Sequence, residues 1–269
     1  MAQIVRTENV SDPRLDDFRD LSTADRRPDR PGGRGLVIAE GTVVVRRLLA
    51  SAYPPRALLG VERRIAELAD DLDGVPVPAY VTTAEVMAEV VGFHLNRGVL
   101  AVADRAPQPD VDEILARSRV IAVLEGVGDH ENVGALFRNA AALGVDGVLL
   151  GAGCADPLYR RSVRVSMGNV LRVPFAALSP WPSALERVRA AGFRIAALTP
   201  RPDSVTLRQL ADLPGRTALL LGSEGPGLTG EALAAADTAV RIPMSEGVDS
   251  LNVATAAAVA FYELATAVS

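Results

Sequence analysis

Residues 120–138 read Val-Ile-Ala-Val-Leu-Glu-Gly-Val-Gly-Asp-His-Glu-Asn-Val-Gly-Ala-Leu-Phe-Arg. The continuous apolar run 120–124 is typical of a strand buried on both faces, and the turn residues after it lead into a helical pattern. Similar runs alternate with helical patterns along the rest of the chain. The predicted strands are 120–124, 147–150, 193–198, 217–221 and 238–242, and the predicted helices lie near 133–143, 158–166, 182–191, 205–212 and 230–236. This alternation predicts an α/β domain built around a parallel sheet.

The first hundred residues carry a shorter alternation of the same kind. Its predicted strands are 36–39, 75–81 and 99–103, and its predicted helices are 42–51, 61–72 and 83–91. Residues 104–110 place two prolines in a polar stretch, which is typical of a linker. We therefore predict an N-terminal arm at 1–33, a small α/β domain at 34–104, a linker at 105–116 and a larger domain at 117–269.

The composition excludes several classes of protein. The 269 residues are 49% hydrophobic and 23% charged, with a net charge of −5, so a buried core is expected. All 28 basic residues are arginine, which excludes a P-loop NTPase and a pyridoxal-phosphate enzyme, because both need a lysine. His94, His130 and Cys154 are too few for a structural zinc site or a disulfide framework, and no metal is expected.

The same counts bear on where the protein works. A lone cysteine suits a reducing compartment, and the N-terminus has no apolar segment typical of a signal peptide. No uninterrupted apolar stretch reaches the length of a membrane span. We therefore expect a soluble, cytoplasmic protein that does not bind membranes.

Residues 159–172 form a locally basic segment in this acidic chain. They contain four arginines and no carboxylate: Arg160, Arg161, Arg164 and Arg172. One interpretation is an ordinary solvated face, and the other is a site for phosphate groups. Ser166 and Gly168 follow the first arginines, and these residue types either cradle a phosphate or end a helix.

Polar residues also gather after several predicted strands, where parallel sheets bind their ligands. Asn132 and Arg138 follow 120–124, and Glu224 lies among glycines after 217–221. Ser250 and Asn252 precede the apolar final helix predicted at 251–268. Helix caps and a glycine-rich turn explain the same residues without a ligand. The glycines at 126, 128 and 134 do not match a dinucleotide-binding fingerprint, which disfavours a dehydrogenase.

Taken together, these segments resemble the SpoU/TrmH family of RNA 2'-O-ribose methyltransferases. The matching pieces are Asn132-x-Gly134-x-x-x-Arg138, Leu221-Gly222-x-Glu224-x-x-Gly227-Leu228, and Ile242-Pro243-Met244 followed by Ser250-Leu251-Asn252. The small domain is similar to the ribosomal L30e fold through residues 37–41 and 97–102. His130 departs from the family pattern, which has proline there, and this bears on the local backbone.

The resemblance implies a deep trefoil knot in the larger domain, S-adenosylmethionine as cofactor, and a homodimer with the last helix in its interface. It implies that the cofactor contacts are Leu198, Thr199, Gly222, Ile242, Met244 and Leu251. It implies that the catalytic residues are Asn132, Arg138, Glu224, Ser250 and Asn252. The residues expected to hold RNA phosphates, from the same or the partner subunit, are Arg160, Arg164 and Ser166.

Several alternatives stay open at this point. Arg138 either acts as a base, for which its pKa above 12 is unfavourable, or stabilises the developing alkoxide. The similarity to a ribosomal fold favours ribosomal over transfer RNA as substrate. A transfer RNA 2'-O-methyltransferase, a catalytically silent RNA-binding homologue and an unrelated metabolite-binding α/β enzyme are the other hypotheses.

Overall fold

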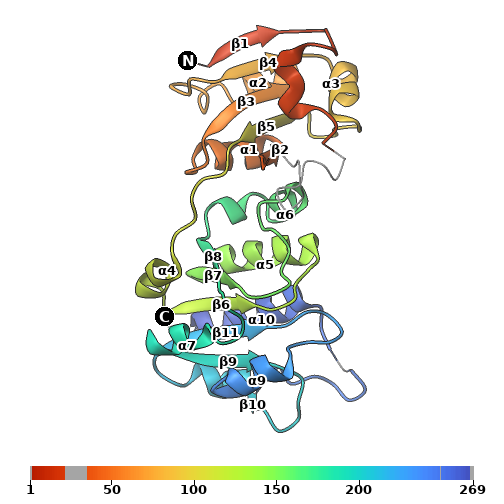
Figure 1. The fold of residues 1–269 in the computed structure, drawn as a ribbon. Helices are drawn as coiled ribbons and strands as arrows, with labels where there is room; N and C mark the ends of the chain where they lie inside the picture. The colour runs from red at the N-terminus through yellow and green to blue at the C-terminus, as the bar shows by residue number, and fades with distance from the viewer. Residues whose placement is uncertain (1, 22–34, 249, 267–269) are drawn as a thin grey trace. The chain divides into compact units, whose positions relative to one another are not determined.

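The computed structural model describes residues 2–21, 35–248 and 250–266, and the chain divides into two units (Figure 1). Unit 1 comprises Met1–Pro107 and Leu158–Arg172, and unit 2 comprises Gln108–Pro157 and Val173–Ser269. The segment Leu158–Arg172 thus belongs to unit 1, although it lies inside the range 117–269 that the sequence predicts as one domain. Within this segment, α6 (Arg160–Val165) packs against β2 (Val37–Glu40), which explains why the segment joins unit 1.

Unit 2 contains, within the described residues, a seven-stranded sheet in the order β10-β12-β9-β11-β6-β7-β8. Its strands are β6 (Val120–Leu124), β7 (Gly147–Leu150), β8 (Phe175–Ala177), β9 (Phe193–Leu198), β10 (Val205–Thr206), β11 (Arg216–Leu221) and β12 (Thr238–Arg241). All neighbouring strands pair in parallel. The predicted α/β fold with a parallel sheet is therefore confirmed.

Six helices of unit 2 are seen in the described part of the chain. They are α4 (Val111–Arg117), α5 (His130–Ala142), α7 (Leu185–Ala190), α8 (Leu207–Ala211), α9 (Gly230–Ala235) and α10 (Val253–Thr266). α5 packs against α10, and the Asn139 side chain on α5 donates to the carbonyl of Ala254 at 2.8 Å. Across the described parts of both units, no helix combines the length and apolar character that a membrane span requires.

Unit 1 contains a five-stranded mixed sheet among its described residues, in the order β1-β4-β3-β5-β2. Its strands are β1 (Gln3–Arg6), β2 (Val37–Glu40), β3 (Pro55–Gly60), β4 (Pro78–Val81) and β5 (Val99–Ala103). Its helices are η1 (Pro13–Phe18), α1 (Thr42–Leu49), α2 (Glu62–Ala66), α3 (Ala84–Val91), α6 (Arg160–Val165) and η3 (Asn169–Leu171). Phe18, Leu59, Met87 and Leu100 belong to one buried core cluster, which is formed by strands of this sheet together with η1 and α3.

The predicted N-terminal arm is folded over its first part. β1 pairs in parallel with β4, and Leu15 and Phe18 are completely buried in the core. β1 is short and three of its four residues are exposed, so its sequence lacks the alternation that reveals a half-buried strand. Residues 22–33 of the predicted arm lie outside the described residues.

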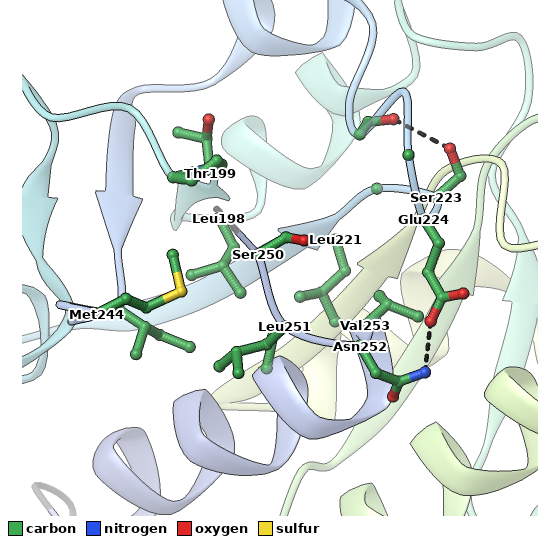
Figure 2. Close-up of a pocket in the computed structure, with 16 residues that line it drawn as sticks. Leu198, Thr199, Leu221, Ser223, Glu224, Met244, Ser250, Leu251, Asn252 and Val253 are labelled. Atoms are coloured by element: carbon green, nitrogen blue, oxygen red, sulfur yellow. Dashed lines mark hydrogen bonds between the residues drawn. The ribbon is translucent and has the colours of Figure 1, made fainter. Parts of the chain in front are cut away.

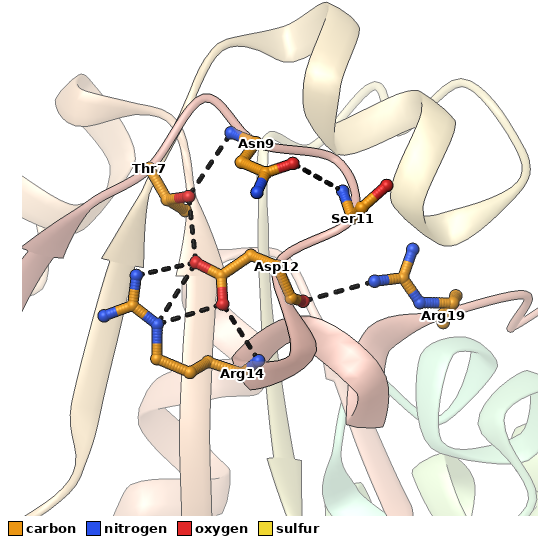
Figure 3. A network of polar contacts seen from close by, with 6 residues as sticks. All are labelled: Thr7, Asn9, Ser11, Asp12, Arg14 and Arg19. Carbon is orange, nitrogen blue, oxygen red and sulfur yellow. Dashed lines mark hydrogen bonds and ion pairs between the residues drawn. The ribbon is translucent and has the colours of Figure 1, made fainter.

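A polar network centred on Asp12 holds the turn between β1 and η1 (Figure 3). The Asp12 carboxylate accepts from the Thr7 hydroxyl at 3.1 Å and from the Arg14 Nη2 at 2.6 Å. Arg19 donates to the main-chain carbonyls of Val10 and Asp12. Hydrogen bonds from Arg14 hold the pKa of the Asp12 carboxyl well below its usual value. This network orders a segment whose sequence alone suggests a loop.

The predicted linker at 105–116 is also partly helical, because α4 begins within it. The Asp110 side chain accepts from the backbone of Asp112 at 2.9 Å, and the Glu113 side chain accepts from the backbone N–H of Asp110 at 3.3 Å. This capping box starts α4, and Val111 and Ile114 bury its apolar face. The prolines before Asp110 hide this start signal in the sequence.

Candidate active site

A pocket of about 470 Å³ lies at the carboxyl ends of β9, β11 and β12, beside the start of α10 (Figure 2). This is the edge at which parallel α/β sheets bind ligands, and the volume is in the range of small-molecule sites. The residues that line it are Leu198, Thr199, Pro200, Leu221, Gly222, Ser223, Glu224, Gly225, Gly227, Ile242, Met244, Ser250, Leu251, Asn252, Val253 and Ala256. All six predicted cofactor contacts and three predicted catalytic residues are in this set.

The sheet side of the pocket is apolar. Leu198 and Leu221 end the neighbouring strands β9 and β11, and Ile242 directly follows β12. Figure 2 shows Met244 and Thr199 on one side of the pocket, with Glu224 and Asn252 on the other. An apolar surface bordered by a few polar groups suits a small ligand that has both apolar and polar parts.

Backbone groups in this lining are free to bind a ligand. Within the described chain, the backbone N–H groups of Gly222, Ile242, Met244 and Leu251 donate to no backbone carbonyl. Backbone N–H groups seek an acceptor, so a ligand in the pocket can accept from them without breaking the sheet. These residues therefore fit a cofactor that is held through main-chain contacts.

The loop 222–228 closes tightly on itself because residue 222 is glycine. A Cβ at Gly222 would collide with the backbone of Gly227 and Leu228. The N–H of Gly227 donates to the carbonyl of Ser223 at 3.1 Å, and Gly225 and Gly227 have φ angles of 83° and 71°. Residues other than glycine rarely adopt such positive φ angles. The glycines thus fold the loop into the turn that presents Glu224.

Three predicted catalytic residues meet in one hydrogen-bonded cluster. The Asn252 Nδ2 donates to the Asn132 Oδ1 at 2.9 Å and to the Glu224 Oε1. The Asn252 Oδ1 accepts from the N–H groups of Ala254 and Thr255 at 3.0 and 3.1 Å, so the same side chain caps α10. Asn252 therefore joins α5, the loop 222–228 and the start of α10.

Arg138 is not brought into this cluster. It is exposed on α5, six residues after Asn132, which corresponds to about 9 Å along the helix axis. It does not line the pocket, and no described residue accepts a hydrogen bond from its guanidinium. Its predicted catalytic role stays a prediction.

The three predicted RNA-binding residues lie on or beside α6, in unit 1. The Arg160 guanidinium lies 4.3 Å from the centre of the Phe93 ring and 3.7 Å from the Glu40 Oε2, and burial lowers its pKa. The Ser166 hydroxyl is buried and donates to the carbonyl of Val163 at 3.0 Å, so it closes the helix end. Arg164 is half-buried and forms no ion pair with a described residue.

A carboxylate that the sequence does not single out also borders the site. Glu125 directly follows β6 and is 5% exposed. Its carboxylate accepts hydrogen bonds from Thr229, the residue that directly follows the loop 222–228. A buried acid immediately after an apolar strand is the signal by which the sequence could have revealed it.

Comparisons with known proteins agree with this geometry. The SpoU rRNA Methylase family matches residues 119–262. A protein described as an uncharacterized tRNA/rRNA methyltransferase of Mycobacterium tuberculosis is 60% identical over 254 residues, which cover 94% of this chain and 88% of the relative. The 23S rRNA (guanosine-2'-O-)-methyltransferase RlmB of Shewanella oneidensis is 31% identical over 188 residues, covering 68% of this chain and 76% of the relative.

A solved structure has the same fold over nearly the whole chain. It is the SpoU methyltransferase AviRb from Streptomyces viridochromogenes in complex with AdoMet, with 25% identity and a TM-score of 0.76. The match covers 95% of this chain and 97% of that chain. The fold and pocket define an α/β protein with a parallel sheet and a pocket at its carboxyl edge. The chain belongs to the SpoU rRNA methylase family, and the resemblance predicted from the motifs is confirmed.

Proposed function

We propose that this protein transfers a methyl group from S-adenosylmethionine to a ribose 2'-hydroxyl of ribosomal RNA. The observation that carries the proposal is the pocket at the ends of β9, β11 and β12, bordered by the Asn132–Asn252–Glu224 cluster. The activity for which RlmB is named, 2'-O-methylation of guanosine in ribosomal RNA, supports the reaction and the substrate. The AdoMet complex of AviRb supports the cofactor.

The pocket residues fit S-adenosylmethionine. The apolar side chains of Leu198, Leu221 and Leu251 provide a surface for the adenine, and the N–H groups of Gly222 and Ile242 are available to its polar edges. When bound, the cofactor supplies an electrophilic methyl group on a positively charged sulfur. Thr199 and Met244 complete the proposed contact set on the far side of the pocket.

The polar cluster positions the ribose in this proposal. Asn252 uses both hydrogens of its amide, one on Asn132 and one on Glu224, which fixes the orientation of both groups. The Glu224 carboxylate can then accept a hydrogen bond from a ribose hydroxyl, and Ser250 borders the same cavity. Such a site promotes an in-line displacement mainly by holding the attacking oxygen in the correct position.

Arg138 is the proposed stabiliser of the negative charge that develops on the attacking oxygen. A guanidinium keeps its proton at neutral pH and is therefore better suited to electrostatic stabilisation than to proton removal. Its exposed position on α5 leaves it accessible to a bound RNA. Arg164, which has no carboxylate partner among the described residues, is the proposed phosphate contact on α6.

Other features that the family resemblance implies belong to the same proposal. They are a trefoil knot in unit 2, an L30e-like RNA-binding domain at 34–104, a homodimer that uses α10, and action in the cytoplasm. The exposed apolar residues Val259 and Tyr262 on α10 support the homodimer. Ribosomal RNA is favoured over transfer RNA because of the named activity of RlmB.

The test is methyl transfer by the purified protein. Cofactor carrying a labelled methyl group is incubated with the protein and either ribosomal or transfer RNA, and the labelled nucleoside is identified by mass spectrometry. We expect 2'-O-methylation of ribosomal RNA, and the same site unmethylated in cells that lack the protein. Transfer of methyl groups only to transfer RNA would reassign the substrate. Cofactor and RNA binding without transfer would identify a catalytically silent homologue and contradict the proposal.

A further inference from the structure

One buried residue holds both ends of the loop that presents Glu224. At the first end, the backbone N–H of Glu125 donates to the carbonyl of Leu221 at 2.9 Å. At the second end, the Glu125 carboxylate accepts from the Thr229 N–H at 2.9 Å and from the Thr229 hydroxyl at 2.8 Å. The loop 222–228 lies between these two attachment points, so Glu125 contacts the chain on both sides of it.

Neutral donors satisfy the Glu125 carboxylate. Besides the two bonds from Thr229, Oε1 accepts from the Trp181 Nε1 at 2.6 Å. The Trp181 ring packs against Gly151, where a Cβ would lie 2.6 Å from a ring carbon, and against the core cluster of unit 2. No arginine forms an ion pair with Glu125 in the described chain. A buried carboxylate that accepts from three fixed donors is well defined in position.

Thr229 transmits this constraint to a second element. Its hydroxyl donates to Glu125 and at the same time accepts from the N–H of Ala232 at 3.2 Å, which makes Thr229 the N-cap of α9. The hydroxyl hydrogen of Thr229 therefore points to the carboxylate, and a lone pair of the hydroxyl oxygen accepts the hydrogen bond that caps α9. The end of the loop and the start of α9 are fixed together.

We propose that Glu125 is a positioning residue for cofactor binding, which acts through the loop 222–228 and does not touch the ligand. Glu125 does not line the pocket, whereas Gly222, Glu224 and Gly227 in the loop do. A loop held at both ends is already ordered before the ligand arrives, so binding does not have to supply that order. The proposal rests on the proposed function, because it takes S-adenosylmethionine as the ligand of the pocket.

The sharpest variant is Glu125→Gln, which keeps the shape of the side chain. An amide offers one acceptor oxygen, and its NH2 group must then face one of the present donors, so at least one donor loses its partner. We expect S-adenosylmethionine, titrated calorimetrically into the full-length protein, to bind about tenfold more weakly. Glu231→Gln on the exposed side of α9 is the matched control, and its affinity is expected to equal that of the wild type.

Two further measurements separate positioning from loss of folded protein. Thr229→Val should weaken cofactor binding and Thr229→Ser should restore it, since serine keeps both the donor and the cap. In the double variant Glu125→Gln/Thr229→Val, the loss of cofactor affinity should be smaller than the sum of the two single losses. Both substitutions break the same contact, between Glu125 and Thr229. In turnover experiments, the KM for the cofactor should rise in Glu125→Gln while kcat changes little. A fall in kcat at unchanged KM, or wild-type affinity with a lower melting temperature, would overturn the proposal.

The ligand-free protein provides a test that does not depend on the proposed function. Amide hydrogen exchange at 222–228, followed by mass spectrometry, should be faster in Glu125→Gln than in Glu231→Gln. If the wild type bound no S-adenosylmethionine, the proposed function would fail, while faster exchange would still show that Glu125 holds the loop. Equal exchange in the two variants would overturn that role. Trp181 is the only tryptophan of the chain, so its fluorescence reports whether the Glu125 contact has changed.

Discussion

The exposed guanidinium of Arg138 is the most informative single group to change. Arg138→Ala should lower the single-turnover rate about 100-fold at saturating RNA, by analogy with the removal of one oxyanion donor. Affinity for the cofactor should stay the same, because the pocket contains no atom of Arg138. Arg138→Lys should also be impaired, since an ammonium lacks the planar group whose N–H donors can bind two neighbouring acceptors together.

The control for this prediction is Arg208→Ala, which removes another exposed arginine of unit 2 from α8. It is expected to turn over at the wild-type rate. A folded Arg138→Ala protein with a normal single-turnover rate would show that Arg138 is an ordinary surface residue.

Asp12 should make the stability of unit 1 depend on pH. Arg14 holds the pKa of the Asp12 carboxyl below its value in the unfolded chain, which is about 3.9. The stabilisation is therefore complete above that value and is lost as the pH falls through the lower pKa of the folded state. Asp12→Asn should lower the melting temperature at pH 7, and its difference from the wild type should narrow below about pH 4.

Thermal unfolding monitored by circular dichroism over this pH range measures the effect. Glu8→Gln is the control, because Glu8 is an exposed carboxylate of the same segment without a described partner. A difference between Asp12→Asn and the wild type that is independent of pH would contradict the assignment of the network to a charged Asp12.

At the scale of elements, the glycine turn after β11 should be intolerant of even one methyl group. In Gly222→Ala the new Cβ would meet the backbone of Gly227 and Leu228, so the loop must open. We expect cofactor affinity, measured by calorimetry, to fall at least tenfold. Gly230→Ala is the matched control, because its Cβ would meet no atom within 4 Å. Equal affinity of the two variants would show that the closed turn is not needed for binding.

The elements differ in how far their sequences reveal them. β6 is apolar throughout and β9 and β11 are mostly apolar, and their alternation with helices identifies all three as buried parallel strands. β10 has two residues and β8 has three, and no periodicity can be recognised at that length. Such short strands form because they pair with a longer neighbour, and this pairing exists only in the folded chain.

The site shows the same division. The spacing of the family motifs is sufficient to place Gly222, Glu224 and Asn252 together, and the structure has them at one pocket. The double role of Asn252 as cap and connector depends on where α5 lies, which no local pattern states. Glu125 was missed for a related reason, because its partners Trp181 and Thr229 are far away in the sequence.

At the scale of the whole molecule, α10 should mediate dimerisation. One of its faces is buried through Ala257 and Phe261, while Val259 and Tyr262 are 39% and 59% exposed on the other. Val259→Glu/Tyr262→Glu should convert a dimer to a monomer. In a two-fold interface the same surface of both subunits is buried, so each substitution places two negative charges in the interface. Sedimentation velocity at micromolar protein measures the change.

Leu213→Glu provides the comparison, since Leu213 is 47% exposed in unit 2 but lies outside α10. It is expected to remain dimeric. A wild-type protein that sediments as a monomer at all concentrations would refute the homodimer itself.

The inclusion of Leu158–Arg172 in unit 1 has a consequence for synthesis on the ribosome. Chains are made from the N-terminus, and domains generally fold as soon as all of their residues have emerged. Unit 1 cannot be finished when Pro107 leaves the exit tunnel, because the residues that complete it are translated only after β6, α5 and β7. A ribosome stalled just before Leu158, with Pro107 already outside the tunnel, would therefore carry a nascent chain that a protease still cuts, whereas one stalled well beyond Arg172 would carry a protected one.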